Sequence, residues 1–365
     1  MENLGLDRLT EIYGKRNVLI TGATGFKGSW LTFWLKKMGA NVSGLGLEPA
    51  TSRSLYSELD YNKDKSIVIL DILDKNSIDL FIKEKKPEII FHLAAQPLVS
   101  VSYDDPADTF MTNIIGLVNL FESLRNSCSV KAAVIVTSDK CYSTETLKKK
   151  FAESDPLGGH DPYSASKACA EIVSKSYYKS FFSDDRISFV TVRAGNIIGG
   201  GDWSKDRLIP DIVKSITEKR SIKLRNPEAV RPWQHVLDAL AGYLIAGGKL
   251  LEGELKGFDS FNFGPAEETV FKVIDIANDF IRKFSAERTF IEFYKSDFIE
   301  TEYLRLDSLK AGNVLGWKSV MDTRTSIEKT AEWYRSYYSK ERSAADLCSQ
   351  DIKNYLNDYK KLHSK

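Results

Sequence analysis

Several residue patterns that mark whole classes of protein are missing from this sequence. The four cysteines have no paired spacing and the four histidines form no cluster, so we predict free thiols and no metal site. No apolar run approaches the ~18 residues that suggest a membrane span, and the N-terminal segment lacks the apolar core of a signal peptide. We therefore expect a cytoplasmic protein that has no membrane partner.

An excess of charge of one sign is also missing. Lys and Arg number 51 against 50 Asp and Glu, which gives a net charge of +1. Nothing in this balance favours a nucleic acid or a membrane surface as the partner. The 365 residues are enough to bury a large core. We therefore expect a globular protein that binds a small molecule.

What the sequence does contain is an alternation of short apolar runs and amphipathic helical stretches. Strands that helices cover on both faces appear as continuous apolar runs, so the pattern predicts an α/β fold with a doubly wound, Rossmann-like parallel sheet. The runs lie at residues 17–21, 42–47, 66–70, 88–93, 131–138 and 187–193.

Beyond the last of these runs the pattern becomes mixed, which indicates a change of domain. We predict an NAD-binding domain over residues 1–190 and a smaller, partly interleaved substrate-binding domain over 191–340. Residues 341–365 are predicted to form a C-terminal helical tail.

A glycine-rich turn, TGATGFKG, joins the first strand to the first helix. Gly22 permits the sharp turn, Gly25 lets the backbone approach a pyrophosphate, and Gly28 allows close packing of the helix on the sheet. The alternative is a simple glycine turn, but the position after strand one favours a dinucleotide. Glu48, with Arg53 nearby, favours NAD over NADP, because an acidic residue there normally binds the ribose hydroxyl.

Further along the crevice, Asp71 follows the third strand and is a candidate for the adenine amino group, although an ordinary strand-end cap is an equal alternative. The residues predicted to contact NAD are Gly22, Thr24, Gly25, Phe26, Gly28, Asp71, Ile72, Leu93, Ala94, Ala95, Gln96, Asn113, Tyr163 and Lys167.

Tyr163 and Lys167 in YSASK are four residues apart, after Pro162, which suits a helix start. Residues at this spacing share one helical face, so the phenol and the ammonium can point at one site. We expect the cation to lower the pKa of the phenol from about 10 and so prepare it as a base for an alcohol.

Taken in order, TGATGFKG, HLAAQP, TNIIG, TSDK and YSASK resemble the extended short-chain dehydrogenase/reductase family. The resemblance extends to LRLDSLKAGNVLGW at residues 304–317 and implies an NAD-dependent enzyme that acts on nucleotide sugars, with a homodimer or homotetramer as the assembly. It also implies that Ser138 holds the substrate hydroxyl, that Tyr163 is the base with Lys167 beside it, and that Asn113 supports the site.

The segment TSDKCY adds Asp139 and Lys140 to this set. Epimerases of the family do not need these groups, whereas a 4,6-dehydratase needs an acid at C6 and a base at C5. We assign Asp139 as the acid and Lys140 as the base, which requires Lys140 to be partly neutral through desolvation and the nearby Lys167. Most sugar-nucleotide 4,6-dehydratases have Glu at the base position. Lys there resembles the branch that acts on CDP-glucose, in deoxysugar and surface polysaccharide (O-antigen) biosynthesis.

The second half of the chain supplies candidates for the nucleotide sugar. Arginine forks match phosphate oxygens, although arginines on loops are often merely solvated. The predicted substrate ligands are Gln96, Asn196, Arg207, Arg225 and Arg231, and Arg193 also falls at a predicted loop. Trp203 and Trp233 suit either a sugar or the core, and His235 suits a structural hydrogen bond at a helix start.

Two other functions remain open at this point. One is a nucleotide-sugar 4-epimerase or a dehydratase of another hexose, in which Asp139 and Lys140 are incidental. The other is a non-enzymatic dinucleotide-binding protein, because a fold does not fix a function. The nucleobase follows from the resemblance alone.

Overall fold

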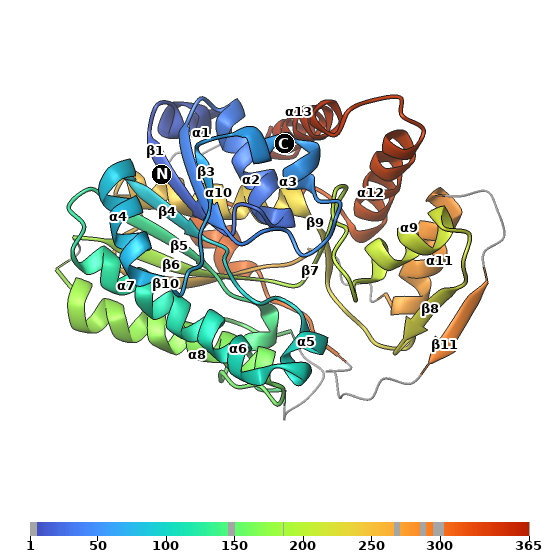
Figure 1. The fold of residues 1–365 in the computed structure, drawn as a ribbon, viewed down its shortest axis with the longest axis horizontal. Helices are drawn as coiled ribbons and strands as arrows, with labels where there is room; N and C mark the ends of the chain where they lie inside the picture. The colour runs from blue at the N-terminus through green and yellow to red at the C-terminus, as the bar shows by residue number, and fades with distance from the viewer. Residues whose placement is uncertain are drawn as a thin grey trace.

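The fold is built around one large parallel sheet (Figure 1). The computed structural model describes residues 6–144, 150–184, 186–265, 271–284, 290–294 and 303–364. Seven strands pair in parallel in the order β10-β6-β5-β4-β1-β2-β3, which confirms the doubly wound, Rossmann-like prediction. Their bounds are β1 Asn17–Thr21, β2 Asn41–Gly46, β3 Ile67–Ile69, β4 Ile89–His92, β5 Ala132–Val136, β6 Ser188–Ala194 and β10 Phe258–Phe263.

Both faces of this sheet are buried, which explains the continuous apolar runs. In β1, Val18 and Ile20 belong to one hydrophobic cluster and Leu19 to the other, because successive side chains of a strand point to opposite faces. One face is covered by α1 Leu6–Tyr13, α2 Phe26–Lys37 and α10 Val236–Leu251, and the other by α4 Lys75–Lys85, α7 Gly116–Arg125 and α8 Pro162–Tyr177.

Several short elements connect the longer helices and strands of the first lobe. They are α3 Leu55–Glu58, α5 Val99–Asp104 and α6 Pro106–Phe110, with the single turns η1 Tyr61–Lys63, η2 Met111–Ile115, η3 Asp139–Cys141 and η4 Tyr178–Phe182. Parallel strands end at the same edge of a sheet, so the segments after β1, β4 and β5 meet there. This edge faces the second lobe.

The second lobe lies at the right of Figure 1 and holds two small parallel sheets. Their strands are β7 Asn196–Ile198 with β9 Trp233–His235, and β8 Ile222–Arg225 with β11 Ile291–Tyr294. The helices are α9 Leu208–Thr217, α11 Val273–Phe284 and α12 Thr323–Tyr338, whereas η5 Ala311–Leu315 packs on α10 and β10 of the large-sheet body. Because α10 and β10 return to the large sheet, the two lobes interleave, and a division at residues 190 and 340 stays a prediction.

The C-terminal segment forms the predicted helix, α13 Ala344–His363, which packs on the body of the molecule. Its Tyr355 is fully buried and donates a hydrogen bond to Asp238 at 3.0 Å, beside the first lobe's α2. The four cysteines are free thiols, as predicted. Across the ranges given above, no helix is both long and apolar enough to cross a membrane.

Candidate active site

The glycine cradle after β1 has the geometry that a pyrophosphate requires. Gly22 has a φ of 70°, and a Cβ there would lie 2.7 Å from the Ala94 nitrogen. A Cβ on Gly28 would lie 2.0 Å from the Gly22 carbonyl oxygen. Gly25 caps α2 without a side-chain hydrogen bond, so no cap side chain competes for the amides of the first turn. These residues therefore fit a dinucleotide.

The adenosine end of the predicted NAD site is more exposed. Glu48 follows β2 on the surface, and Arg53 lies 5.9 Å from the ring of Trp203 and 3.8 Å from Glu58. The Asp71 carboxylate accepts a hydrogen bond from the Leu73 amide at 2.9 Å, which is the strand-end cap that the sequence offered as one alternative. Neither arrangement tests whether Glu48 or Asp71 binds the cofactor.

Asn113 fixes the turn after β4. Its Oδ1 accepts from the Gln96 amide at 2.8 Å, and its Nδ2 donates to the Gln96 carbonyl at 3.1 Å and to Ser166 Oγ on α8 at 2.8 Å. The Gln96 side chain bonds to the backbone of Leu98 and to Thr109, and it is not part of the cavity lining. Asn113 thus links the turn to the helix that carries Tyr163, and the role of Gln96 as a substrate ligand stays a prediction.

A cavity of about 280 Å³ lies between the two lobes and brings most of the predicted site together. Its first-lobe wall contains the five predicted catalytic residues, namely Ser138, Asp139, Lys140, Tyr163 and Lys167. Its second-lobe wall contains four of the five predicted substrate ligands, namely Asn196, Arg207, Arg225 and Arg231. Groups that are far apart in the chain therefore face one enclosed space of ligand size.

Asp139 is the most unusual group in this cavity. It is 2% exposed, and its Oδ1 accepts a hydrogen bond from Ser138 Oγ at 3.0 Å. Its Oδ2 is buried and has no hydrogen-bond partner among the described residues. Burial raises the pKa of Asp139 to about 6, against the opposing effects of Lys140 and Arg231. A carboxyl group in this state can hold a proton near neutral pH and give it to a ligand.

Tyr163 and Lys167 lie on one face of α8, as their spacing predicted. Asp161 caps this helix by accepting from the Ser164 amide at 2.9 Å. The expectation that the phenol is acidified is wrong for this structure, because burial raises the pKa of Tyr163 to about 12 although a Ser138 hydrogen bond lowers it. Burial also lowers the pKa of Lys167 to about 8, while Glu171 acts in the opposite direction.

The arginines of the second lobe contact their own neighbours. Arg207 Nη1 lies 3.1 Å from Asp202 Oδ2, and Arg225 Nη2 donates to the Asp206 carbonyl at 3.0 Å. Arg231 is 7% exposed and donates to the Val230 carbonyl at 3.0 Å. All three line the cavity, so their positive charge faces the space that a ligand would occupy.

Arg193 is not on a loop, contrary to the sequence reading. It lies inside β6, is 3% exposed and pairs with Glu171. Trp203 packs with aromatic residues of α12, whereas Trp233 is buried and lines the cavity. His235 caps α10 by accepting from the Leu237 amide at 3.3 Å, which confirms its structural role.

Lys27 is a cavity residue that the sequence reasoning missed. It lies in the first turn of α2, and its ammonium is 5.9 Å from the centre of the Tyr243 ring. Burial lowers the pKa of Lys27 to about 7, and Arg207 and Lys167 add to this effect. No local pattern marked Lys27, because its place in the cavity follows from the packing of the two lobes.

Comparison with known proteins shows the family to which the chain belongs. A model of the NAD dependent epimerase/dehydratase family matches residues 18–262. The chain belongs to this family. The matched range begins in β1 and ends in β10, so it includes the cradle, the Ser-Asp-Lys segment and the Tyr-Lys helix.

Individual relatives cover nearly all of the chain. CDP-glucose 4,6-dehydratase of Salmonella typhimurium is 39% identical over 94% of this chain and 97% of its own length. The solved epimerase Mth375 of Methanothermobacter thermautotrophicus has a TM-score of 0.78 at 23% identity and covers 92% of this chain and 96% of its own. The dTDP-glucose 4,6-dehydratase of Bacillus anthracis, solved with NAD, has a TM-score of 0.73 at 22% identity and covers 89% and 98%.

These relations define the general activity. The protein is an NAD-dependent enzyme of the nucleotide-sugar epimerase/dehydratase class. The solved structures, at these identities, show the shared fold and no more. The substrate and the reaction must be argued from the cavity.

Proposed function

We propose that the enzyme dehydrates CDP-glucose to CDP-4-keto-6-deoxyglucose, a precursor of deoxysugars. The observation that carries this proposal is the buried Asp139 carboxyl group, whose Oδ2 faces no partner among the described residues and whose pKa is raised to about 6. A 4-epimerase has no step that requires an acid at this position. The 39% identity to a CDP-glucose 4,6-dehydratase supports the same substrate.

The first-lobe residues have distinct tasks in this reaction. Tyr163, as the phenolate, takes the proton of the C4 hydroxyl, which Ser138 orients through its own hydroxyl group. Because burial raises the pKa of Tyr163 to about 12, the nearby Lys167 ammonium and the positive charge of bound NAD must favour this phenolate. NAD, when bound, supplies the hydride acceptor and donor at this site. The 4-ketone that results makes the C5 proton acidic, and Lys140 removes it.

Asp139 then completes the elimination. Its carboxyl group protonates the C6 hydroxyl, which leaves as water, so the acid must be protonated before the step begins. The raised pKa increases the protonated fraction of Asp139 near neutral pH, because burial disfavours the carboxylate more than Lys140 and Arg231 favour it. The hydride returns to C6 and Lys140 returns a proton to C5, so the net change is the loss of one water.

The second lobe holds the nucleotide in this proposal. Arg207, Arg225 and Arg231 bring positive charge to the cavity wall opposite the catalytic segment, where a diphosphate would be bound. Asn196, at the start of β7, adds a neutral donor to the same wall.

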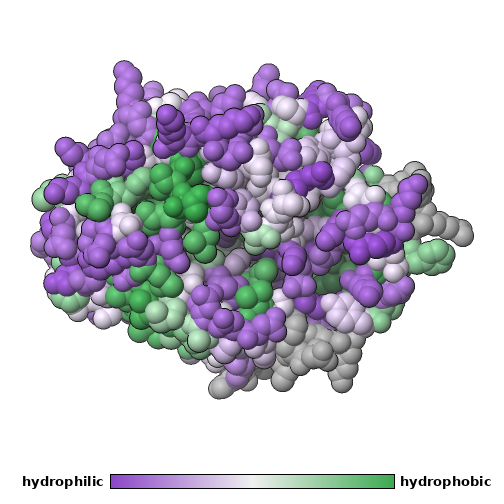
Figure 2. Space-filling model, in the orientation of Figure 1, coloured by the Kyte–Doolittle hydropathy of each residue, from purple (hydrophilic) through white to green (hydrophobic). Residues whose placement is uncertain are grey.

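We also propose that two copies of the chain associate through the α6–η2–α8 face. Phe110, Met111, Ile115 and Ile172 are large apolar residues that are 37 to 57% exposed on these adjoining elements. Figure 2 shows hydrophobic surface in the lower left of the view, in the region of α6, α7 and α8 in Figure 1. Such a face favours association. Light scattering tests this proposal, and a monomer at micromolar concentration would contradict it.

A substrate panel tests the function directly. The protein is mixed with NAD and with CDP-, UDP-, GDP- or dTDP-glucose, and the base-induced ultraviolet absorbance of a 4-keto sugar is measured. We expect this absorbance with CDP-glucose and little with the others. A changed sugar without the absorbance would indicate an epimerase. Absorbance mainly with another nucleotide sugar would make that nucleotide sugar the substrate instead of CDP-glucose.

A further inference from the structure

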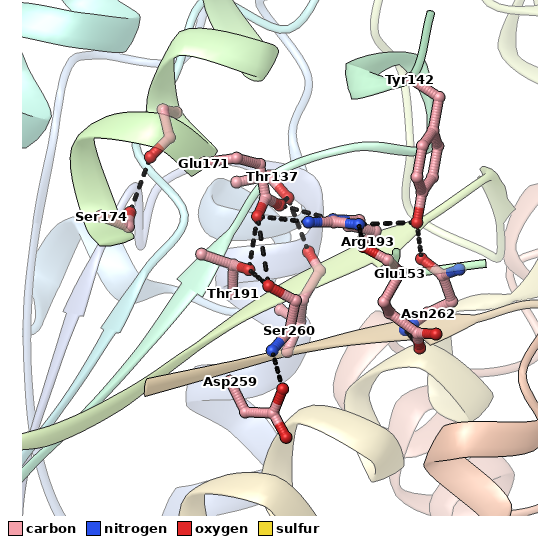
Figure 3. A network of polar contacts seen from close by, with 12 residues as sticks. Thr137, Tyr142, Glu153, Glu171, Ser174, Thr191, Arg193, Asp259, Ser260 and Asn262 are labelled. Atoms are coloured by element: carbon pink, nitrogen blue, oxygen red, sulfur yellow. Dashed lines mark hydrogen bonds and ion pairs between the residues drawn. The ribbon is translucent and has the colours of Figure 1, made fainter. Parts of the chain in front are cut away.

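The short segment that carries Asp139 and Lys140 is fastened at both ends to one buried ion pair. Thr137 precedes Ser138 at the end of β5, and Tyr142 follows η3. Each of these two side chains bonds to one member of the Glu171–Arg193 pair. Figure 3 shows the pair at the centre of this network, between the strands and α8.

The ion pair itself is closed to solvent and well formed. Arg193 Nε donates to Glu171 Oε1 at 2.8 Å, and Arg193 Nη2 donates to Glu171 Oε2 at 2.7 Å. The two side chains are 3% and 1% exposed. A buried ion pair with two hydrogen bonds is held in a defined geometry, because each charge has lost its contact with water and is compensated by the other.

The two ends of the catalytic segment each bond to the pair, which Thr191, Ser260 and the Glu153 carbonyl also contact. Thr137 Oγ1 donates to Glu171 Oε1, and Arg193 Nη1 donates to the Tyr142 hydroxyl at 2.7 Å. The Tyr142 hydroxyl donates in turn to Asn262 Oδ1 on β10 at 2.7 Å. The Tyr142 ring also lies 5.0 Å from the Arg193 guanidinium. Residues 137 and 142 are therefore fixed to the same two side chains.

The same pair also belongs to the helix that carries the base. Glu171 lies one turn beyond Lys167 and two turns beyond Tyr163 on α8. Arg193 lies on β6, which pairs with β5 in parallel register. The ion pair thus connects the segment that carries Asp139, the sheet and the helix that carries Tyr163 through direct side-chain hydrogen bonds.

We propose that Thr137, Tyr142, Glu171 and Arg193 form a positioning clamp that holds the Ser138–Lys140 segment in register with Tyr163 and Lys167. The clamp residues do not line the catalytic cavity, with the exception of Thr137, so they act through the groups that do. This role rests on the proposed dehydratase function.

The clamp has a specific consequence for the order of steps. Oxidation at C4 needs Tyr163 and Lys167, which α8 holds without the clamp, and only Ser138 from the clamped segment. Elimination across C5 and C6 also needs Asp139 and Lys140 in place. A displacement of about 1 Å can cost ~10²-fold in rate, so loosening the segment slows elimination more than oxidation and leaves the cofactor reduced.

The test removes a hydroxyl group and leaves both buried charges paired. Tyr142→Phe deletes the bond to Arg193, which still contacts Glu171 and the Glu153 carbonyl. Thr137→Val deletes the bond at the other end. Tyr177→Phe is the matched control. Tyr177 lies on α8 but does not line the cavity, and its hydroxyl donates to Glu122 on α7 at 2.9 Å.

With CDP-glucose and NAD, we expect Tyr142→Phe and Thr137→Val to lower kcat at least ~10-fold with KM changed less than ~2-fold, and NADH to accumulate during turnover. Thr137→Ser keeps the hydroxyl group and should restore most of the activity. Tyr177→Phe should behave as the unmodified protein does. Thermal unfolding curves show that each variant is folded.

Three outcomes overturn the clamp. They are wild-type kinetics in both folded variants, a loss of activity without NADH accumulation, and equal losses in Tyr177→Phe. Failure of the dehydratase function is seen separately, as absence of the 4-keto absorbance in the unmodified protein. NADH accumulation is then measured with the sugar nucleotide that does turn over, because return of the hydride needs the same alignment.

Discussion

The two walls of the cavity are built in different ways. On the first-lobe wall, Asp139 and Tyr163 are buried side chains whose backbones are held by a strand end and a capped helix. On the second-lobe wall, Arg207 and Arg225 are less buried and hold contacts with Asp202 and Asp206 that a ligand could share or replace. The first wall is thus built from buried side chains, whereas these two arginines of the second wall are less buried.

The difference separates chemistry from binding. Acid and base groups need positions accurate to a fraction of an ångström, which a buried network can supply. A diphosphate needs charge and several donors, which arginines supply with less demand on their exact placement. Changes on the first wall should therefore lower kcat, whereas changes on the second should raise KM.

The largest effect is expected for Tyr163→Phe. Without the phenolic oxygen no group on α8 can take the C4 proton, so NADH formation should fall by ~10³-fold, within the range for loss of an acid-base group. Absorbance at 340 nm in single turnover measures this step. Lys175→Ala, an exposed change on the same helix, is the control. Retained NADH formation would show that another group is the base.

Lys140→Ala should give the next largest effect, and at a later step. Solvent deuterium incorporation at C5 should fall by ~10²-fold while NADH still forms slowly, because Lys140 acts only after oxidation. Mass spectrometry of the product measures the incorporation. Unchanged uptake of deuterium would assign the C5 base to another residue, for which Lys27 is a candidate on the same cavity wall.

Arg231→Met is the corresponding change on the second wall. Loss of charge-assisted hydrogen bonds to a diphosphate should raise the KM for the nucleotide sugar by ~10-fold or more, with kcat nearly constant. Initial rates over a range of substrate concentrations separate the two constants. Arg282→Met, 78% exposed and far along α11, should change neither. A fall in kcat with constant KM would place Arg231 with the chemical groups.

The smallest effect concerns the stability of the first wall. The pKa of Asp139 is raised from 3.8 to about 6, so the folded protein holds a proton there that the unfolded chain has lost. This group therefore costs stability as the pH rises from about 4 through about 6. Asp139→Asn removes the cost and should increase the free energy of unfolding by up to about 3 kcal/mol at pH 8, and by less near pH 5. Urea unfolding at both pH values measures the gain, and a gain that does not grow with pH would contradict the assignment.

Much of the first wall could be predicted from the sequence. The glycine spacing after β1 located the cradle, and the four-residue spacing of Tyr163 and Lys167 placed both on one helical face. These signals are local, because they depend only on a turn, a strand end or a helix. The Ser138–Lys140 segment was found for the same reason, since parallel strands end at the ligand side of a sheet.

What the sequence could not supply were the properties that depend on distant segments. Arg193 appeared to be a loop residue that could bind phosphate, but the pairing of β6 with β5 and β10 buries it against Glu171. Lys167 was expected to acidify Tyr163, but burial has the larger effect and raises the pKa to about 12. Lys27 was overlooked because only the packing of the two lobes shows that it faces the cavity.

The sequence by itself determined the sheet, the cradle and the identity of the acid and base candidates, because each follows from residue types at short spacing. The tertiary structure alone decided which charges are buried, which groups pair, and that Thr137 and Tyr142 share one anchor. The physical reason is that desolvation and ion pairing sum over all the segments that surround a group. Those segments are brought together only by strand order and helix packing.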